Sequence, residues 1–571
     1  MVFSPRNFTV LLQSLSLTPR ALHPLAAEDR SCGVECDAIY PLPWTNLGVA
    51  PDHDCSVQPY DPGDVSVQNF PLFDAAKANV YRYRQQQAVN LGSWFVHENW
   101  MVPSLFTCAA GSMLSEIDIA SGWGSTESAR ALLERHWDSF ITPVDFHYLS
   151  SIGINTVRLP IGYWNLGPDF CVGTPFEPVK DVYRNAWSRV VRAVNMASDV
   201  GIGVLVDLHG APGSQNGQPH SGISDGKTEL FGNDWFTNKT LDVLTFLVEE
   251  LVNVTNVVGI QILNEPTNDP LLPDFYSTAI STMRAVSPAA ECLPLYIHDG
   301  FDRDKFSEFV ANRPDFVVED THSYFVFTPQ DEAEPASQHT NDVHTSVADS
   351  LAAASQRARR NLIVGEFSCA LTDDSLKNEP DKDAARRDFC TTQMEIYQNE
   401  TAGWAFWAYT KEQCMDDPGW CFRAAAGSSL PASFFSYGEA SMNHRTDFSA
   451  IRVWDDYGAS PEPVMVAVSG DGSSYSRSRP FRPNLRRRGD PHGLDQTELA
   501  VARGYSDGLA TANLFAEHGM SKLGFTGQYM NDSIARLGAH IIAPGAEDHY
   551  RRWFLEGLAE GEVLVAAHLA Q

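Results

Sequence analysis

Two glutamates, Glu265 and Glu366, each follow a short apolar run that is typical of a buried β-strand. They lie in the sequences Ile-Leu-Asn-Glu-Pro and Ile-Val-Gly-Glu-Phe. Hydrolysis of a glycosidic bond needs one protonated carboxyl, which assists the leaving oxygen, and one ionised carboxyl, which meets the developing oxocarbenium carbon. Two such strands in one sheet would bring this pair to the same face. A single glutamate after a strand is more often an ion-pair partner or a cap, so the surrounding elements decide.

Those elements form a repeated pattern of strand followed by helix. Stretches such as 184–197 and 241–251 have apolar residues every three to four positions, which indicates helices between the strands. The eight apolar runs cover residues 88–96, 154–161, 203–209, 257–264, 293–298, 316–322, 361–366 and 403–409. This pattern predicts an α/β fold, a (β/α)8 TIM barrel, whose chemistry lies at the carboxyl ends of the strands. An open doubly wound sheet is the alternative, but its glycine-rich phosphate-binding turns do not occur in this sequence.

Motifs at the ends of these runs resemble those of the fungal exo-β-1,3-glucanases of glycoside hydrolase family 5. The resemblance extends between roughly residues 85 and 430. The motifs are residues 90–96, 158–164, 207–217, 263–266, 298–301, 320–324, 365–368 and 403–407. The resemblance implies a retaining double displacement that needs no metal or other cofactor, with Glu265 as acid/base and Glu366 as nucleophile.

Four polar residues beside the pair are expected to support it. Asn264, directly before Glu265, can donate a hydrogen bond to the sugar 2-hydroxyl, a contact that strengthens in the transition state. Arg158 would lower the pKa of the nucleophile, although it could instead form a purely structural ion pair. His322 and Tyr324 alternate along one strand end and therefore share a face, where they can hydrogen-bond the nucleophile and the sugar.

The family resemblance implies four further contacts with the substrate. Glu98 and His209 match positions that bind the hydroxyls of the terminal sugar, and either could instead be a structural residue of the barrel rim. Trp407 matches the aromatic platform under the sugar, where an indole face can stack on the pyranose ring. Trp404 is expected in the core. Phe327 matches one half of an aromatic clamp around the sugar of the leaving group.

The sequence also departs from the family pattern. After Gly-Ser-Gln-Asn-Gly the family has an aromatic residue followed by Asp-Asn-Ser-Gly, whereas this chain has Gln218-Pro-His-Ser-Gly. Half of the clamp is therefore missing, and we expect a looser leaving-group subsite. Glu-Pro-Trp has become Glu98-Asn-Trp, with His97 before it, and the residue after the nucleophile is Phe367 instead of Trp. Two alternatives remain open: a rutinosidase-like family 5 diglycosidase that acts on plant flavonoid glycosides, and a catalytically impaired carbohydrate-binding barrel.

Composition limits the partners. The chain has 571 residues, a formal net charge of −31 and a pI near 4.8. This acidity argues against nucleic acid or an anionic membrane as partner and suits a soluble protein with a neutral ligand. We expect a monomer that binds a β-glucan or β-glucoside substrate. The sequence contains no run of 18 apolar residues, so we expect no membrane span.

Ten cysteines and several N-glycosylation sequons favour the secretory route, and we expect a secreted or cell-wall protein. A signal peptide is plausible but not evident. The sequons begin at Asn7, Asn238, Asn253, Asn399 and Asn531. Local disulfides could join Cys32 to Cys36 or Cys414 to Cys421. Buried free thiols are the alternative, and the spacing does not match a zinc site.

The length exceeds that of a single barrel, which predicts additional segments. We expect a leader or extension over residues 1–45, the catalytic domain over 46–460, a basic Pro/Arg-rich linker over 461–491 and a small helical module over 492–571. Helical periodicity in residues 494–503 and 550–558 indicates the last of these. The module could pack against the barrel or bind a separate partner.

Overall fold

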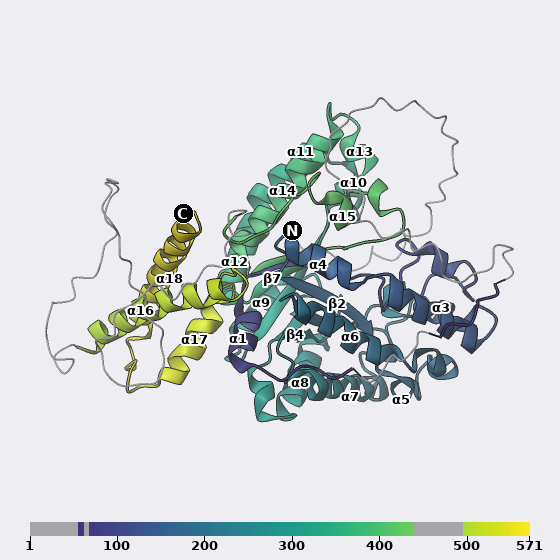
Figure 1. Cartoon of the computed structure of the whole chain (residues 1–571), viewed down its shortest axis with the longest axis horizontal. Coiled ribbons are helices and arrows are strands. Elements are labelled where there is room, and N and C mark those ends of the chain that lie inside the picture. Colours follow the sequence, from purple (N-terminus) through teal and green to yellow (C-terminus); the bar gives the residue numbers. More distant parts are fainter. Residues whose placement is uncertain (1–54, 62–67, 439–494, 571) are drawn as a thin grey trace. The chain divides into compact units, whose positions relative to one another are not determined.

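Eight parallel strands close into a barrel in chain order, and β8 pairs with β1 (Figure 1). The computed structural model describes residues 55–61, 68–438 and 495–570. The strands are β1 Gln86–Asn90, β2 Thr156–Gly162, β3 Gly203–Gly210, β4 Val257–Gln261, β5 Leu295–His298, β6 Val317–Ser323, β7 Leu362–Phe367 and β8 Gly403–Phe406. The predicted (β/α)8 barrel is confirmed. The predicted leader, 1–45, and linker, 461–491, lie outside the described residues.

Some predicted strands are too long at their carboxyl ends. The first run was expected over 88–96, but β1 ends at Asn90, and residues 91–96 form a buried turn in which Ser93 has a φ of 56°. Trp94 and Phe95 in this turn are fully buried. Their apolar character therefore reflects burial beneath the rim of the barrel rather than a strand. This turn, rather than the strand itself, positions the polar residues His97 and Glu98 that follow it.

Helices cover the outside of the barrel (Figure 1). The α-helices up to residue 425 are α1 Ala75–Tyr83, α2 Glu116–Ser121, α3 Thr126–Ser139, α4 Pro143–Ser151, α5 Pro168–Cys171, α6 Ala186–Asp199, α7 Asp234–Leu251, α8 Leu272–Ala285, α9 Arg303–Ala311, α10 Pro329–Ala333, α11 Ala336–Asp342, α12 Ala348–Arg357, α13 Asp373–Leu376, α14 Lys382–Glu400 and α15 Phe422–Ala425. Shorter helical turns are η1 Pro103–Phe106, η2 Tyr163–Leu166, η3 Glu177–Tyr183, η4 Pro219–Ser221, η5 Pro288–Cys292, η6 Val343–Val347 and η7 Cys414–Asp416.

Helix α7 shows why the periodic stretches form helices. The side chain of Asn233 caps its first turn by accepting a hydrogen bond from the backbone N–H of Trp235. Val243, Leu244 and Leu247 lie on one face and are fully buried. Burial of this apolar face against the barrel holds the helix in place, as its spacing predicts.

The C-terminal region consists of three helices, α16 Gln496–Glu517, α17 Thr526–Leu537 and α18 Glu547–Leu569, which confirms the predicted helical appendage. The residues between α16 and α17 pack against the amino ends of the barrel strands. Phe525 contacts the rings of Tyr296 and Phe316, and the N–H of Gly524 donates to the carbonyl of Tyr83. The appendage therefore packs on the barrel, at the end opposite to the carboxyl ends of the strands.

Three disulfides link the described residues: Cys55–Cys108, Cys369–Cys390 and Cys414–Cys421. The last confirms one of the two predicted local pairs, and the other, Cys32 with Cys36, lies outside the described residues. Among the helices that the structure describes, none is long and apolar enough to cross a membrane.

Candidate active site

Arg158 lies at the centre of a buried polar network inside the barrel. Its Nη1 donates to Glu366 Oε1 at 2.9 Å, and its Nε donates to Gln261 at 2.7 Å. Its Nη2 donates to the side-chain oxygen of Asn264 at 2.7 Å and lies 3.1 Å from an Asp207 carboxylate oxygen. The guanidinium is therefore held from several strands at once. The structure places it beside Glu366, as predicted.

His322 brings the two predicted catalytic carboxyls together. Its Nδ1 lies 2.7 Å from Glu265 Oε1 and 3.4 Å from Glu366 Oε2. The triangle through His322 Nδ1 thus places these two oxygens at most about 6 Å apart. Glu265 has a φ of 41°, in the left-handed region that non-glycine residues seldom adopt. Such backbone conformations cluster at functional sites.

The two carboxyls have different electrostatic surroundings. Burial raises the pKa of Glu366 to about 8, although His322 and Arg158 act in the opposite direction. Burial would also raise the pKa of Glu265, but the hydrogen bond and charge of His322 outweigh burial and lower it. This order is the reverse of the one that an acid/base Glu265 and a nucleophile Glu366 need.

The hydrogen bonds resolve this conflict. Arg158 and the hydroxyl of Tyr324, which lies 2.8 Å from Glu366 Oε2, both remain protonated near neutral pH and stabilise an ionised Glu366. Glu265 shares its short hydrogen bond with an imidazole that can itself lose a proton. The pair of Glu265 with His322 therefore holds one proton, which either residue can carry. We assign the roles from these donors.

His322 itself is fixed by a second carboxylate. Its Nε2 lies 3.4 Å from Asp320 Oδ2, on the same strand two residues earlier. Burial alone would lower the pKa of His322, but the charges of Glu366 and Asp320 outweigh this and raise it. His322 is thus able to store a proton between the two catalytic carboxyls.

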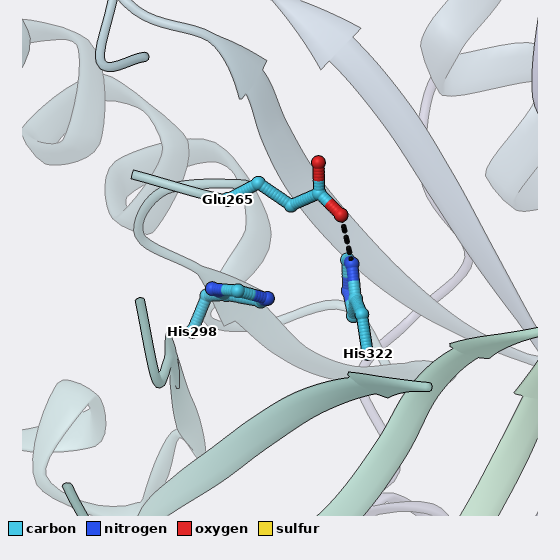
Figure 2. Close-up of side chains that lie close together, drawn as sticks. All are labelled: Glu265, His298 and His322. Carbon is cyan, nitrogen blue, oxygen red and sulfur yellow. Dashed lines mark hydrogen bonds and ion pairs between the residues drawn. The ribbon is translucent and has the colours of Figure 1, made fainter. Parts of the chain in front are cut away.

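Figure 2 shows His298 and His322 beside the Glu265 carboxylate. Ligand atoms of these three residues lie within 4.8 Å of one another, close enough to hold a metal ion. Their protons argue against one, however. The N–H of Gly300 donates to His298 Nδ1 at 3.0 Å, so neutral His298 carries its proton on Nε2. A metal at Nε2 would move that proton to Nδ1, where it would face the N–H of Gly300. The trio therefore does not fit a divalent metal.

The predicted sugar-binding residues lie around the same centre. Asp207 Oδ2 accepts from His209 Nδ1 at 2.7 Å, which leaves His209 Nε2 as an acceptor 3.3 Å from the Asn264 amide nitrogen. Trp407 stacks on the His209 ring with centroids 5.6 Å apart and 10° between the planes. Trp404 is buried in the core, as predicted. His209, Asn264 and Trp407 thus form one continuous surface beside Glu265.

Glu98 lies close enough to Glu265 for the two carboxyls to interact electrostatically. Its carboxylate accepts from the indole N–H of Trp100 at 2.9 Å, and burial raises its pKa to about 7. His97, which departs from the family pattern, points away from this carboxylate. Its Nδ1 lies 2.6 Å from Glu116, and both side chains are fully buried. The side chain of His97, the residue that departs from the family pattern, is therefore used in a buried hydrogen bond with Glu116.

Aromatic side chains form a wall from the nucleophile to the solvent. The ring of Tyr324, which bonds Glu366, lies 5.5 Å from Trp420 and 5.4 Å from the half-exposed Phe327. Trp420 also contacts Trp100 at 5.3 Å. Trp420 also lies 6.1 Å from Phe327, so this side of the entrance has more than one aromatic ring. The expectation that the half of the clamp at Gln218 is missing stays a prediction.

Sequence reasoning missed several residues of this centre. Asp207 and Asp320 lie two positions before His209 and His322 on the same strands, so the period of two along a strand could have identified them. His220, in the departing motif, lies 3.7 Å from Glu265 Oε2. Neither His220 nor Trp420 carries a sequence signal of this kind, because both lie on loops after strands.

Comparisons with known proteins agree with this geometry. Residues 126–413 match the family model "Cellulase (glycosyl hydrolase family 5)". "Glucan 1,3-beta-glucosidase 3" of Schizosaccharomyces pombe is 37% identical over 341 residues, which cover 58% of this chain and 70% of that protein. "Probable glucan 1,3-beta-glucosidase A" of Aspergillus niger is 31% identical over 380 residues, which cover 60% of this chain and 85% of that protein.

Among solved structures, a rutinosidase from Aspergillus niger is similar, with a TM-score of 0.47 and 17% identity over 60% of this chain and 96% of that chain. A likeness of this size carries no argument about substrate. The family match and the S. pombe relative are sufficient for the family. This chain belongs to glycosyl hydrolase family 5 and is a glycoside hydrolase.

Proposed function

We propose that this enzyme releases glucose from the non-reducing end of β-1,3-glucan or related β-glucosides by a retaining double displacement. The observation that carries the proposal is the bridge of His322 between Glu265 and Glu366, together with the Arg158 and Tyr324 donors to Glu366. The names of the S. pombe and A. niger relatives support the choice of substrate.

In the first half-reaction, Glu366 attacks the anomeric carbon while Glu265 delivers a proton to the leaving oxygen. Arg158 and Tyr324 hold the Glu366 carboxylate ionised and oriented. The side-chain amide of Asn264, whose oxygen is occupied by Arg158, directs its N–H groups toward the sugar 2-hydroxyl and His209. This contact strengthens as the oxocarbenium character develops.

In the second half-reaction, Glu265 acts as a base and takes a proton from water, which attacks the glycosyl–Glu366 ester. The released sugar keeps its anomeric configuration. His322 stabilises Glu265 in its ionised form through the hydrogen bond at 2.7 Å, and so the same imidazole serves both halves of the cycle.

Sugar recognition follows from the remaining residues. Glu98 and His209 bind hydroxyls of the terminal glucose, and Trp407 forms the platform beneath it. Phe327 contacts the sugar of the leaving group. We infer the exo mode of attack from the family resemblance.

A product profile on laminarin oligosaccharides, aryl β-glucosides and rutin tests the substrate. We expect glucose from laminarin oligosaccharides, and proton NMR of the first product should show the β-anomer before mutarotation. Release of intact rutinose from rutin without glucose from laminarin would contradict the proposed substrate. An α-anomer as first product would contradict double displacement, and no release from any of the three would support a carbohydrate-binding barrel.

We also propose that the enzyme enters the secretory route and acts outside the cell or at the cell wall as a monomer, with residues 46–460 as the catalytic domain and 492–571 as a helical module. The three disulfides suit an oxidising compartment. Asn238, Asn253 and Asn399 are exposed, whereas the side chain of Asn531 accepts from Arg551. Glycopeptide mapping of protein from a fungal host should find glycans at the first three. Their complete absence would contradict the secretory route.

A further inference from the structure

Side chains hold the turn after β1 that presents Glu98. Ser93 in this turn has a φ of 56°, and its carbonyl oxygen accepts from His136 Nε2 at 2.8 Å. The backbone N–H of Glu98 donates to the Ser93 hydroxyl at 3.1 Å. Buried backbone groups need hydrogen-bond partners, so the path of the turn depends on the side chains that supply them.

Glu116 supplies the partner of the peptide directly before Glu98. Its Oε2 accepts from the backbone N–H of His97 at 3.1 Å and lies 2.6 Å from Nδ1 of the same residue. Its Oε1 accepts from the Tyr183 hydroxyl at 2.9 Å. The side chains of His97 and Glu116 are fully buried. Since donors meet both oxygens, Glu116 acts as an acceptor, and His97 donates to it through Nδ1–H.

The first turn of α2, which carries Glu116, is itself fixed from two sides. Within the turn, the N–H of Ser115 donates to Asp118 Oδ2 at 3.2 Å. Outside it, the N–H of Ile117 donates to the carbonyl of Gly222 at 3.1 Å. Glu116 is therefore an acceptor in a fixed position, and the peptide of His97 must lie where this acceptor is.

The Glu98 carboxyl faces two partners. Its Oε2 accepts from the indole N–H of Trp100 at 2.9 Å, which leaves Oε1 for a sugar hydroxyl. A carboxyl that serves both tolerates little movement of its backbone, since a displacement of about 1 Å breaks a hydrogen bond. The placement of the His97 peptide thus decides whether Glu98 can serve both.

We propose that Glu116 is a positioning residue for recognition of the terminal sugar. By fixing the peptide of His97, it sets the direction in which Glu98 presents its carboxyl to a hydroxyl of that sugar. The inference deepens the proposed function and rests on it, because Glu98 binds the terminal glucose there.

A comparison of KM with kcat tests this role. Glu116→Leu removes both acceptor oxygens at a similar side-chain volume. We expect KM for 4-nitrophenyl β-glucoside to rise about tenfold and kcat to change less than about twofold, because the lost contact binds ground state and transition state alike. Laminaritriose should show the same rise, since the contact is with the terminal sugar. An unchanged KM, or a loss confined to kcat, would overturn the proposal.

Two further variants separate positioning from general stability. Glu116→Gln keeps an acceptor oxygen for His97, and KM should stay within about twofold of the wild-type value. Glu134→Leu is the matched control, because it removes another buried carboxyl, one that accepts from Asn185 at 2.6 Å. It should lower Tm and leave KM unchanged. An equal rise in KM with Glu134→Leu, or none of the expected rescue by glutamine, would contradict the role.

A double-mutant cycle distinguishes this inference from the proposed function. In a Glu98→Ala background, Glu116→Leu should raise KM by no more than about twofold further, because the two residues act through one contact. Multiplying effects would overturn the inference. A rise in KM with Glu98→Ala but none with Glu116→Leu would refute this inference alone, whereas an unchanged KM with Glu98→Ala would refute the sugar contact on which it rests. If Glu116→Leu did not fold, Glu116→Asp, which withdraws the carboxylate by one methylene, would make the same comparisons.

Discussion

Glu319 on β6 is a buried carboxyl that the site does not use. It is fully buried, and neither of its carboxyl oxygens has a hydrogen-bond partner among the described residues. Burial raises its pKa well above the ordinary value, and nearby Asp299 adds to this, while Arg303 and Arg357 act in the opposite direction. In the folded enzyme, Glu319 therefore keeps its proton to a higher pH than a glutamate in the unfolded chain does.

This neutral state makes folding sensitive to pH. In the unfolded chain a glutamate ionises near pH 4.3, and each pH unit above that value costs the protonated folded form about 1.4 kcal/mol. The cost accumulates over the pH range between the unfolded pKa and the raised folded pKa. Since the pKa of Glu319 is raised in the folded state, its contribution to the free energy of unfolding is fully present below about pH 4. That contribution is lost as the pH rises towards the folded pKa.

Glu319→Gln, which resembles the neutral acid in shape but cannot ionise, should therefore stabilise the enzyme at pH 7 and have little effect at pH 4. For a chain of this length, the cost of each pH unit, about 1.4 kcal/mol, corresponds to a rise in Tm of about 1 °C. Differential scanning calorimetry of wild type and variant at both pH values measures this, with the exposed Glu395→Gln as control. An equal change in Tm at both pH values, or a loss at pH 7, would refute the reasoning.

Three further predictions concern the active site. Glu366→Ala should abolish turnover, whereas Glu265→Ala should retain more activity on dinitrophenyl glucosides than on poor leaving groups; equal losses would show that the roles are wrongly assigned. Gln218→Phe should leave kcat/KM on laminaritriose unchanged, because Trp420 already supplies an aromatic ring. Trp420→Ala should lower kcat/KM several-fold, since aromatic stacking contributes roughly 0.5–1.5 kcal/mol. A rise in kcat/KM with Gln218→Phe and no loss with Trp420→Ala would show that the entrance lacks a stacking ring at Gln218. Arg158→Lys, which loses most of the guanidinium hydrogen bonds, should raise the pKa of Glu366 and shift the acidic limb of kcat/KM to higher pH, and an unchanged limb would contradict the ion pair.

The sequence predicted the barrel because its strands have long apolar runs that end in polar residues. It also indicated that Glu265 and Glu366 lie close together, since Glu366 lies near the carboxyl end of β7, Glu265 follows the end of β4, and a parallel barrel brings all such ends together. Strand ends were less certain. The turn after β1 is as apolar as a strand because Trp94 and Phe95 are buried in it, and burial alone does not distinguish the two structures.

The loops could not be predicted in the same way. His220 and Trp420 reach the site through turns whose paths depend on local contacts rather than on a repeating pattern. For His220 the decisive contact is with Asn216, whose amide is oriented by two backbone groups. For Trp420 it is the neighbouring disulfide, Cys414–Cys421, together with the ring of Tyr324. Pairwise contacts of this kind leave no trace in hydrophobic periodicity.

The two carboxyls differ in whether their hydrogen-bond donors can lose a proton near neutral pH, and this difference separates their functions. Glu366 is held by Arg158 and Tyr324, neither of which changes protonation near neutral pH, so its charge is constant and suits a nucleophile. Glu265 Oε1 faces the imidazole of His322, a group that can exchange protons in that range. A residue that must be an acid in one half-reaction and a base in the next requires such surroundings. The division of roles therefore follows from the donors rather than from the carboxyls themselves.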